Sequence, residues 1–122
     1  MITLLDSEGI DTKLESEVAG ASEIVADLMK AISLSENSKI SVAFGNVVGI
    51  TYSALCSKGI GFDYSLATTK SKISPINTDV YISMMLEQTE GINKNQLINR
   101  YNDEFSSPIN AAKLGYVDNI IE

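Results

Sequence analysis

Short apolar runs alternate along the chain with segments whose apolar residues have a helical spacing. The runs Ile2–Leu5 and Ile40–Phe44 have the length and composition that predict buried strands. Between them, apolar residues recur every three or four positions from Leu14 to about Leu34, which predicts one long amphipathic helix. The side chains expected on its buried face are Val18, Ala21, Val25, Leu28 and Ile32.

The stretch from Lys39 to Lys58 contains the feature around which the rest is expected to be organised. Gly45-Asn46 predicts a turn after the strand, and a helix is expected from about Gly49 to Lys58, with Gly59 as a left-handed cap. This order places backbone N–H groups without intrahelical partners at the start of the helix. Such groups bind anions or stabilise a developing oxyanion without any catalytic side chain.

The second half of the chain continues the alternation of strands and helices. Pro75 cannot donate a backbone hydrogen bond, so a strand that contains it is expected to be short or to lie at an edge. The elements expected here are strands at Asp63–Ala67 and Lys72–Ile76, a helix capped by Asn77 and running to about Glu90, helix starts at Asn93 and at Ser107-Pro108, a last helix over Ile109–Leu114 that ends at Gly115, and an extended segment over Tyr116–Ile121.

The resulting order, β-α-β-α-β-β-α-α-α, predicts a single α/β domain with right-handed crossovers. Ligands of such sheets bind at the carboxyl ends of the strands, beside helix N-termini. In this chain that rule indicates residues Gly45–Thr51.

Composition narrows the class of function. The net charge is -7 and no basic residues cluster, which argues against a nucleic-acid partner. Hydrophobic residues make up 44% of the 122 positions, which is typical of a globular chain. No apolar run is long enough to cross a bilayer, and no signal-like segment begins the chain, so a cytoplasmic protein without membrane insertion is expected.

The reactive side chains are few. The chain has no histidine, which excludes Ser-His-Asp and Cys-His nucleophile systems within it, and no metal site is expected. Cys56 is the single cysteine and is expected to be a core residue inside a helix, so no intramolecular disulfide can form. Asp6 and Glu8 are either solvated loop groups or a carboxylate pair for acid–base chemistry.

Several fragments, in order, match the pattern of one family. They are Leu4-Leu5-Asp6-Ser7-Glu8-Gly9-Ile10, then Lys39-Ile40, Gly45–Tyr52, Ser57-Lys58, Asp63 to Asn77, and the ending with Tyr101, Phe105, Pro108, Ala111-Ala112, Gly115-Tyr116-Val117-Asp118 and Ile120-Ile121. With these fragments the chain resembles the C-terminal half of the carboxyltransferase subunit of biotin-dependent acyl-CoA carboxylases and decarboxylases. The resemblance covers nearly the whole chain.

The resemblance implies a crotonase-like ββα-spiral fold, with residues 1–122 as a C-terminal-type carboxyltransferase domain that lacks its N-terminal half. It implies carboxyl transfer between carboxybiotin and an acyl-CoA, with biotin supplied on a separate carrier domain. The backbone amides of Ile50 and Thr51 would polarise the ureido oxygen of biotin. Biotin contacts are implied for Val48, Gly49, Gly9 and Ile10.

The resemblance also implies partners, and it leaves a second function open. A homo-oligomer is expected, together with an N-terminal-half carboxyltransferase subunit and a biotin carrier protein. The family's Arg-Lys pair is replaced here by Gly45-Asn46, and its Gly-Gly-Ala by Gly49-Ile50-Thr51. The alternative hypothesis is therefore a non-catalytic or degenerate crotonase-fold subunit that acts in assembly.

Overall fold

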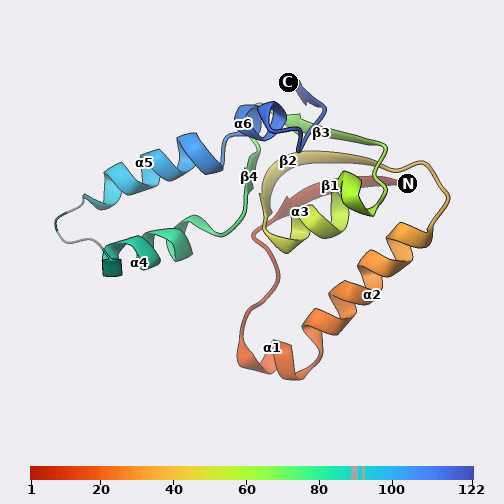
Figure 1. Ribbon diagram of the computed structural model, residues 1–122, viewed down its shortest axis with the longest axis horizontal. Coiled ribbons are helices and arrows are strands. Elements are labelled where there is room, and N and C mark those ends of the chain that lie inside the picture. Colours follow the sequence, from red (N-terminus) through yellow and green to blue (C-terminus); the bar gives the residue numbers. More distant parts are fainter. Residues whose placement is uncertain (89–90, 92) are drawn as a thin grey trace.

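The computed structural model describes residues 1–88, 91 and 93–122, which form a parallel sheet, helices beside it and a projecting helical hairpin (Figure 1). The expected end of one helix near Glu90 lies outside the described residues. The strands are β1 (Ile2–Ser7), β2 (Ile40–Val48), β3 (Tyr64–Thr68), β4 (Lys72–Ser74) and β5 (Asn119–Ile121). The helices are α1 (Leu14–Val18), α2 (Ala21–Leu34), α3 (Ile50–Leu55), the 3-10 turn η1 (Lys58–Ile60), α4 (Thr78–Gln88), α5 (Lys94–Phe105) and α6 (Pro108–Lys113).

The strands pair in the order β1-β2-β3-β5, and β4 pairs with the far end of β2. Every one of these pairs is parallel. The prediction of an α/β domain is therefore confirmed. The short strand β4 ends just before Pro75, as the missing N–H of proline requires.

The expected turn at Gly45-Asn46 is wrong, because β2 continues through these residues to Val48. The first part of β2 pairs with β1 and β3, and Asn46–Val48 pairs with β4, so one strand serves two parts of the sheet. Its register against β1 shifts between Leu5 and Ser7, which marks a bulge at the bend. At this bulge the carboxylate of Asp6 accepts a hydrogen bond from the Asn46 N–H at 2.8 Å.

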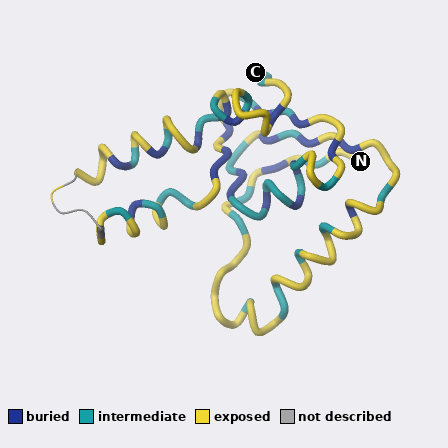
Figure 2. The backbone as a smooth tube through the Cα atoms, in the orientation of Figure 1, coloured by how far each residue is buried: buried dark blue, intermediate teal, exposed yellow. Residues whose placement is uncertain are grey.

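The single helix expected from Leu14 to Leu34 is also wrong, because it is divided into α1 and α2 at Gly20. Gly20 has φ of 87°, a left-handed conformation that interrupts a helix and that glycine adopts without a steric penalty. Of the expected buried face only Ile32 is buried, while Val18 and Leu28 are exposed. The physical reason is that α2 contacts only its neighbours α1, α3 and η1 to any extent within the described residues, and most of its length is exposed (Figure 2).

Helix α3 is shorter than expected, since it ends at Leu55 rather than near Lys58. The chain then enters η1, where the Ser57 hydroxyl accepts a hydrogen bond from the Gly59 N–H at 3.0 Å. The left-handed residue is Gly61, with φ of 93°, so the predicted cap at Gly59 is wrong by two residues.

Small side chains fill the space between the sheet and α3. Ala43 and Ala67 have no exposed surface, and Cys56 joins them in the same core, which confirms its expected packing role. Its expected place inside a helix is wrong, because α3 ends one residue earlier. The Ser41 hydroxyl donates to Cys56 Sγ at 3.1 Å, and the Ser65 hydroxyl donates to the Cys56 carbonyl at 2.7 Å. Burial raises the pKa of the Cys56 thiol, as expected for a buried residue kept as a neutral thiol.

Helices α4 and α5 form a hairpin that extends away from the sheet (Figure 1). The predicted caps are confirmed, because Asn77 Oδ1 accepts from the Asp79 N–H and Asn93 Oδ1 from the Asn95 N–H, both at 2.9 Å. Between the helices, the ring of Tyr101 stacks on that of Tyr81 with centroids 4.4 Å apart.

The C-terminal segment is attached to the sheet by Asp118. One carboxylate oxygen pairs with the Lys58 ammonium and the other accepts from the Ser65 N–H at 2.8 Å. The Lys58 hydrogen bond and then the Ser65 N–H hold the pKa of Asp118 below its ordinary value. These contacts place β5 beside β3.

Candidate functional site

The junction between β2 and α3 is built on Gly49. Its φ of 56° and ψ of -118° lie in a region that residues with a Cβ rarely adopt. The Gly49 N–H donates to the Ser74 carbonyl at 2.8 Å, and a Cβ on Gly49 would lie 3.0 Å from the Pro75 carbonyl oxygen. The end of β4 therefore holds the chain where α3 begins.

Two backbone donors follow this junction. The Gly49 carbonyl accepts the first bonds of α3, from Tyr52 N–H at 3.1 Å and Ser53 N–H at 3.4 Å. Among the described residues, the N–H groups of Ile50 and Thr51 have no hydrogen-bond acceptor. They are consecutive donors that can bind one oxygen atom of a ligand.

The turn after β1 lies against the same junction. Ser7 Oγ is 3.3 Å from Thr51 Oγ1, accepts from the Gly9 N–H at 3.3 Å and donates to the Gly9 carbonyl at 3.2 Å. A Cβ on Gly9 would lie 3.8 Å from the Val48 carbonyl oxygen. The structure thus brings Gly9 close to Val48 and links its turn to Thr51, although these segments are about 40 residues apart in sequence.

Ile10 follows this turn, and its side chain is exposed. Four of the six predicted site residues, Val48, Gly49, Ile50 and Thr51, are consecutive in sequence. Gly9 is brought to them by folding. Their role as a biotin site stays a prediction.

The two carboxylates of the turn are structural. Glu8 accepts from the side-chain amide of Asn46 at 2.6 Å and from that of Asn77 at 2.9 Å. It therefore joins the turn to β2 and to the start of α4. Asp6 is occupied by the Asn46 N–H. The geometry favours the loop interpretation of this pair over the acid–base interpretation.

The position of Asp6 allows us to predict what a larger residue at Gly45 would do. A Cβ on Gly45 would lie 2.1 Å from Asp6 Oδ1 and 2.2 Å from Asp6 Cγ, so one of the two must move. We expect Gly45→Ala to lower the free energy of unfolding by about 1–3 kcal/mol, because it displaces the acceptor of the Asn46 N–H. Urea unfolding followed by circular dichroism measures this difference.

The matched control is the double variant Gly45→Ala with Asp6→Ala. Removing the carboxylate makes room for the new methyl group, so the double variant should be more stable than the sum of the two single changes predicts. Additive effects of the two substitutions would show that the carboxylate and the methyl group do not compete for this space.

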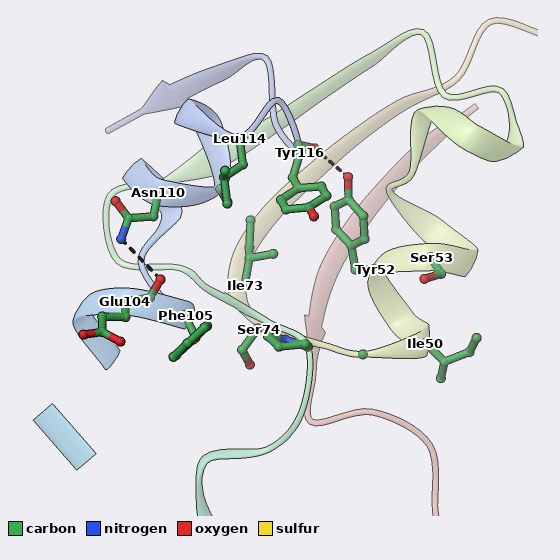
Figure 3. A pocket seen from close by; sticks show the side chains of 13 residues that line it. Ile50, Tyr52, Ser53, Ile73, Ser74, Glu104, Phe105, Asn110, Leu114 and Tyr116 are labelled. Carbon is green, nitrogen blue, oxygen red and sulfur yellow. Dashed lines mark hydrogen bonds between the residues drawn. The ribbon is translucent and has the colours of Figure 1, made fainter. Parts of the chain in front are cut away.

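A cavity of about 690 Å³ opens beside the start of α3 (Figure 3). Its wall includes the rings of Tyr52 and Tyr116, which meet edge to face with centroids 5.6 Å apart. The Tyr52 hydroxyl donates to the Tyr116 carbonyl at 2.8 Å. The lining residues are Gly49, Ile50, Tyr52, Ser53, Ile73, Ser74, Pro75, Glu104, Phe105, Asn110, Ala111, Leu114 and Tyr116.

The cavity and the predicted residues coincide only in part. Gly49 and Ile50 line it, but the aromatic wall was not predicted as part of a site. Tyr116 was expected only as the first residue of an extended segment, and no local pattern brings it to Tyr52, which lies 64 residues earlier. Val48 instead lines a smaller polar hollow of about 190 Å³, together with Asn46, Lys72 and Asn77.

The surroundings of Tyr52 in the cavity wall raise the pKa of its hydroxyl, and this pKa can be measured. Burial is the largest cause that raises the pKa of Tyr52 to about 12, and the neighbouring Cys56 is the next. The unfolded chain ionises tyrosine near pH 10, so it releases this proton before the folded chain does. We therefore expect Tyr52 to contribute a fall in stability as pH rises from about 10 to about 12.

The pKa of Tyr52 is measured from the ultraviolet absorbance of tyrosinate during a pH titration. The Tyr52→Phe variant should lack the part of the absorbance change that occurs near pH 12. A titration in which Tyr52→Phe removes a component near pH 10 would contradict the assignment.

Two kinds of feature are absent from the described ranges. No three histidine, cysteine, aspartate or glutamate side chains lie close enough together to hold a metal ion in residues 1–88, 91 and 93–122. Over the same residues, every helix is too short or too polar to span a lipid bilayer.

The parallel sheet and the bent strand β2 give the chain the crotonase-like fold, which solved structures of carboxyltransferases share. Comparison by sequence gives the same class, because residues 1–122 match the carboxyl transferase domain family along their whole length. The chain belongs to the carboxyl transferase domain family.

Two relatives by sequence are subunits of one kind of enzyme. The chain is 25% identical over 128 residues to methylmalonyl-CoA decarboxylase subunit alpha of Propionigenium modestum, and 27% identical over 122 residues to that of Veillonella parvula. All of the chain is covered, but only 25% and 24% of these relatives. The chain therefore spans about a quarter of their length.

Solved structures share the fold over the same extent. Transcarboxylase 12S, solved as a hexamer with methylmalonyl-coenzyme A and methylmalonic acid bound, superimposes with a TM-score of 0.90 at 24% identity over 99% of this chain and 24% of its own. The beta subunit of geranyl-CoA carboxylase from P. aeruginosa gives a TM-score of 0.86 at 14% identity over 98% of this chain and 24% of its own. At this level of identity the likeness shows the fold.

Proposed function

We propose that the chain is a component of a biotin-dependent carboxyltransferase that moves a carboxyl group between carboxybiotin and an acyl-CoA. The observation that carries the proposal is the family match along residues 1–122. The two relatives by sequence, both named as methylmalonyl-CoA decarboxylase subunits, support an acyl-CoA as the second substrate.

In this proposal the N–H groups of Ile50 and Thr51 hold the ureido oxygen of biotin. The site fits that group, because two adjacent donors without an acceptor suit a carbonyl oxygen and the neighbouring cavity has room for a ring system. Biotin, when bound, would carry the carboxyl group that is exchanged with the acyl-CoA: carboxybiotin would give it up, and biotin would receive it in the reverse direction. Because their positions are fixed by Gly49 and the Ser74 carbonyl, the two donors stabilise negative charge on that oxygen without rearranging.

The other proposed contacts surround this oxygen. In this proposal Val48, Gly49, Gly9 and Ile10 are the other residues that contact biotin. Gly9 lies near the Val48 carbonyl, and its turn is linked to Thr51 through Ser7. The proposed partners are a biotin carrier protein, an N-terminal-half carboxyltransferase subunit and further copies of the chain. The transcarboxylase hexamer is consistent with assembly of this kind.

The test is an amide NMR titration of the ¹⁵N-labelled chain with biotin and then with an acyl-CoA. We expect biotin to shift the resonances of residues 45–52 and of the Gly9 turn. Shifts spread evenly over the chain, or none at these positions at high biotin concentration, would contradict the proposed biotin site.

Two substitutions at Ile50 make the test sharper. Ile50→Gly keeps the N–H and is expected to retain or improve biotin binding, because it removes a branched side chain from the site. Ile50→Pro removes the N–H at the first position of α3, where proline is compatible with a helix, and is expected to weaken binding about tenfold. Equal affinities for the two variants would exclude a role for this donor.

The second candidate function is a subunit that acts in assembly without turnover. The residues at positions 45 and 46 favour it. The family segment that the chain resembles has an Arg-Lys pair at Gly45-Asn46. Here Gly45-Asn46 carries no charge, and the Asp6 carboxylate occupies the space that a side chain at Gly45 would need. Ordered association with a carboxyltransferase partner without carboxyl transfer would support this candidate.

A further inference from the structure

Three consecutive carbonyl groups at the end of β4 lie against different parts of the fold. The Ser74 carbonyl accepts a hydrogen bond from the Gly49 N–H at 2.8 Å, and the Pro75 carbonyl oxygen would lie 3.0 Å from a Cβ on Gly49. The Ile76 carbonyl accepts from two hydroxyl groups, that of Ser74 at 3.1 Å and that of Tyr101 at 2.5 Å. These three residues, called the Pro75 bend below, therefore contact the α3 junction on one side and α5 on the other.

The two side chains that donate to the Ile76 carbonyl are both buried, because Ser74 is 6% exposed and Tyr101 is 1% exposed. Among the described residues, neither hydroxyl makes a second hydrogen bond. A carbonyl oxygen has two lone pairs and can accept both donors at once. Since a buried hydroxyl without a partner is costly, both hydroxyl groups are held to this one carbonyl.

The Pro75 bend has little conformational freedom of its own. Before it, Ser74 pairs with the last residue of β2, and the Ile73 N–H donates to the Ser106 carbonyl at 3.2 Å. Within it, the ring of Pro75 fixes φ. The direction in which the chain leaves β4 then depends on what holds the Ile76 carbonyl. The two hydroxyl groups thus control the orientation of the bend, and with it the orientation of the Ser74 carbonyl.

Gly49 connects the Pro75 bend to the two backbone donors at the start of α3. Its N–H bonds to the Ser74 carbonyl, and its own carbonyl accepts the first bonds of the helix. The helix start that presents the N–H groups of Ile50 and Thr51 is therefore attached to the end of β4 through Gly49. A displacement of the Ser74 carbonyl would move the two donors with it.

We infer that Tyr101 and Ser74 are positioning residues for the N–H groups of Ile50 and Thr51, and that their hydroxyl groups act through the Pro75 bend. The inference rests on the proposed function, in which these two donors hold the ureido oxygen of biotin. Tyr101 is not among the residues that line the cavity beside α3, so its hydroxyl acts from behind the site. Ser74 lies in the cavity wall (Figure 3), but its hydroxyl is engaged by the Ile76 carbonyl.

The test compares the native-state amide resonances of the ¹⁵N-labelled chain and of its Tyr101→Phe variant, without ligand. Removing the hydroxyl leaves the Ile76 carbonyl with one donor instead of two, so the bend loosens. We expect the Gly49 amide proton to shift upfield, because its hydrogen bond to Ser74 lengthens, and the resonances of residues 50 and 51 to move with it. In a subsequent titration, biotin should bind this variant about three- to tenfold more weakly than the parent chain.

Tyr81→Phe is the matched control. It makes the same chemical change on the ring that stacks on Tyr101, at a hydroxyl that makes no hydrogen bond within the described part of the chain. It should leave the resonances of residues 49–51 in place and change the affinity for biotin less than about twofold.

These resonances distinguish positioning from a purely structural role, because they report on the folded molecules alone. If Tyr101 only stabilised the fold, Tyr101→Phe would lower the free energy of unfolding and leave the resonances of residues 49–51 as they are. Shifts there no larger than those caused by Tyr81→Phe would overturn the inference.

A second pair of variants decides the matter if Tyr101→Phe does not fold. Ser74→Ala removes the other donor to the Ile76 carbonyl and should produce the same upfield shift of the Gly49 amide proton. Its control is Ser83→Ala, which removes a hydroxyl that donates to the Asp79 carbonyl at 2.9 Å within α4. Equal effects of these two substitutions on residues 49–51 would overturn the inference.

The two stages of the experiment separate this inference from the proposed function, because the first stage contains no biotin. If Tyr101→Phe moved the resonances of residues 49–51 but the parent chain gave no response to biotin, the proposed biotin site would be removed and the positioning of the donors would stand. If the parent chain and Tyr101→Phe bound biotin equally well, the proposed function would stand and the inference would be overturned.

Discussion

Tyr101→Ala is expected to lower the free energy of unfolding by about 3–5 kcal/mol, the range for removing a large buried ring. Tyr101 is 1% exposed, and its ring contacts those of Tyr81 and Phe105, with centroid distances of 4.4 and 5.6 Å. Its hydroxyl donates to the Ile76 carbonyl at 2.5 Å, just before α4. One side chain therefore holds α5 against α4 and against the segment that leads to it.

Tyr101→Phe separates the ring from the hydroxyl. It keeps the packing and removes one hydrogen bond, so a loss of about 1–2 kcal/mol is expected. Urea unfolding of both variants, followed by circular dichroism, gives the two values. If alanine and phenylalanine had equal effects, the hydroxyl rather than the ring would hold the hairpin, contrary to this prediction.

Gly49→Ala is expected to lower the free energy of unfolding by about 2–4 kcal/mol, because it combines an unfavourable backbone conformation with crowding. The positive φ is strained for any residue with a Cβ, and the new methyl group would lie 3.0 Å from the Pro75 carbonyl oxygen. Relief of this contact would shift α3 away from β4. We therefore expect the variant also to lose the NMR response to biotin at residues 50 and 51.

Gly115→Ala is the matched control for this substitution. Gly115 also has a positive φ, of 80°, but a methyl group added there would meet no neighbouring atom within 4 Å. Its replacement should cost only about 1 kcal/mol, from the backbone conformation alone. Equal losses for the two glycines would mean that the contact with Pro75 has no influence on stability.

Local signals in the sequence predicted the elements that depend on local interactions. Asn77 and Asn93 bond to amides two residues ahead, so both caps were found. A turn was wrongly predicted at Gly45-Asn46, because the conformation of these residues depends on Asp6, 40 residues away. The Asp6 carboxylate accepts the Asn46 N–H and so stabilises the bulge in the strand pair. A glycine–asparagine pair indicates a turn only when no distant partner satisfies its backbone.

The same distinction applies to the candidate site. The start of a helix near Gly49 was predicted from the local pattern, although the strand before it was expected to end at Phe44 and in fact continues to Val48. The cavity wall was missed because Tyr52, Phe105 and Tyr116 come from three segments that only the fold brings together. The division of the long helix at Gly20 was missed as well, since apolar spacing alone does not show where a glycine turns left-handed.

Apolar side chains on one side of the β1-β2-β3 sheet are exposed, and this affects the calorimetry of the chain. Unfolding raises the heat capacity in proportion to the apolar surface that becomes newly hydrated, typically by about 12–15 cal/mol/K per residue. Ile2, Leu4, Phe44 and Tyr64 already contact water in the folded chain, so they contribute less to this change. The chain should therefore show a smaller increase in heat capacity on unfolding than is typical for its length, and its free energy of unfolding should vary less steeply with temperature. Covering these side chains should make that temperature dependence steeper again.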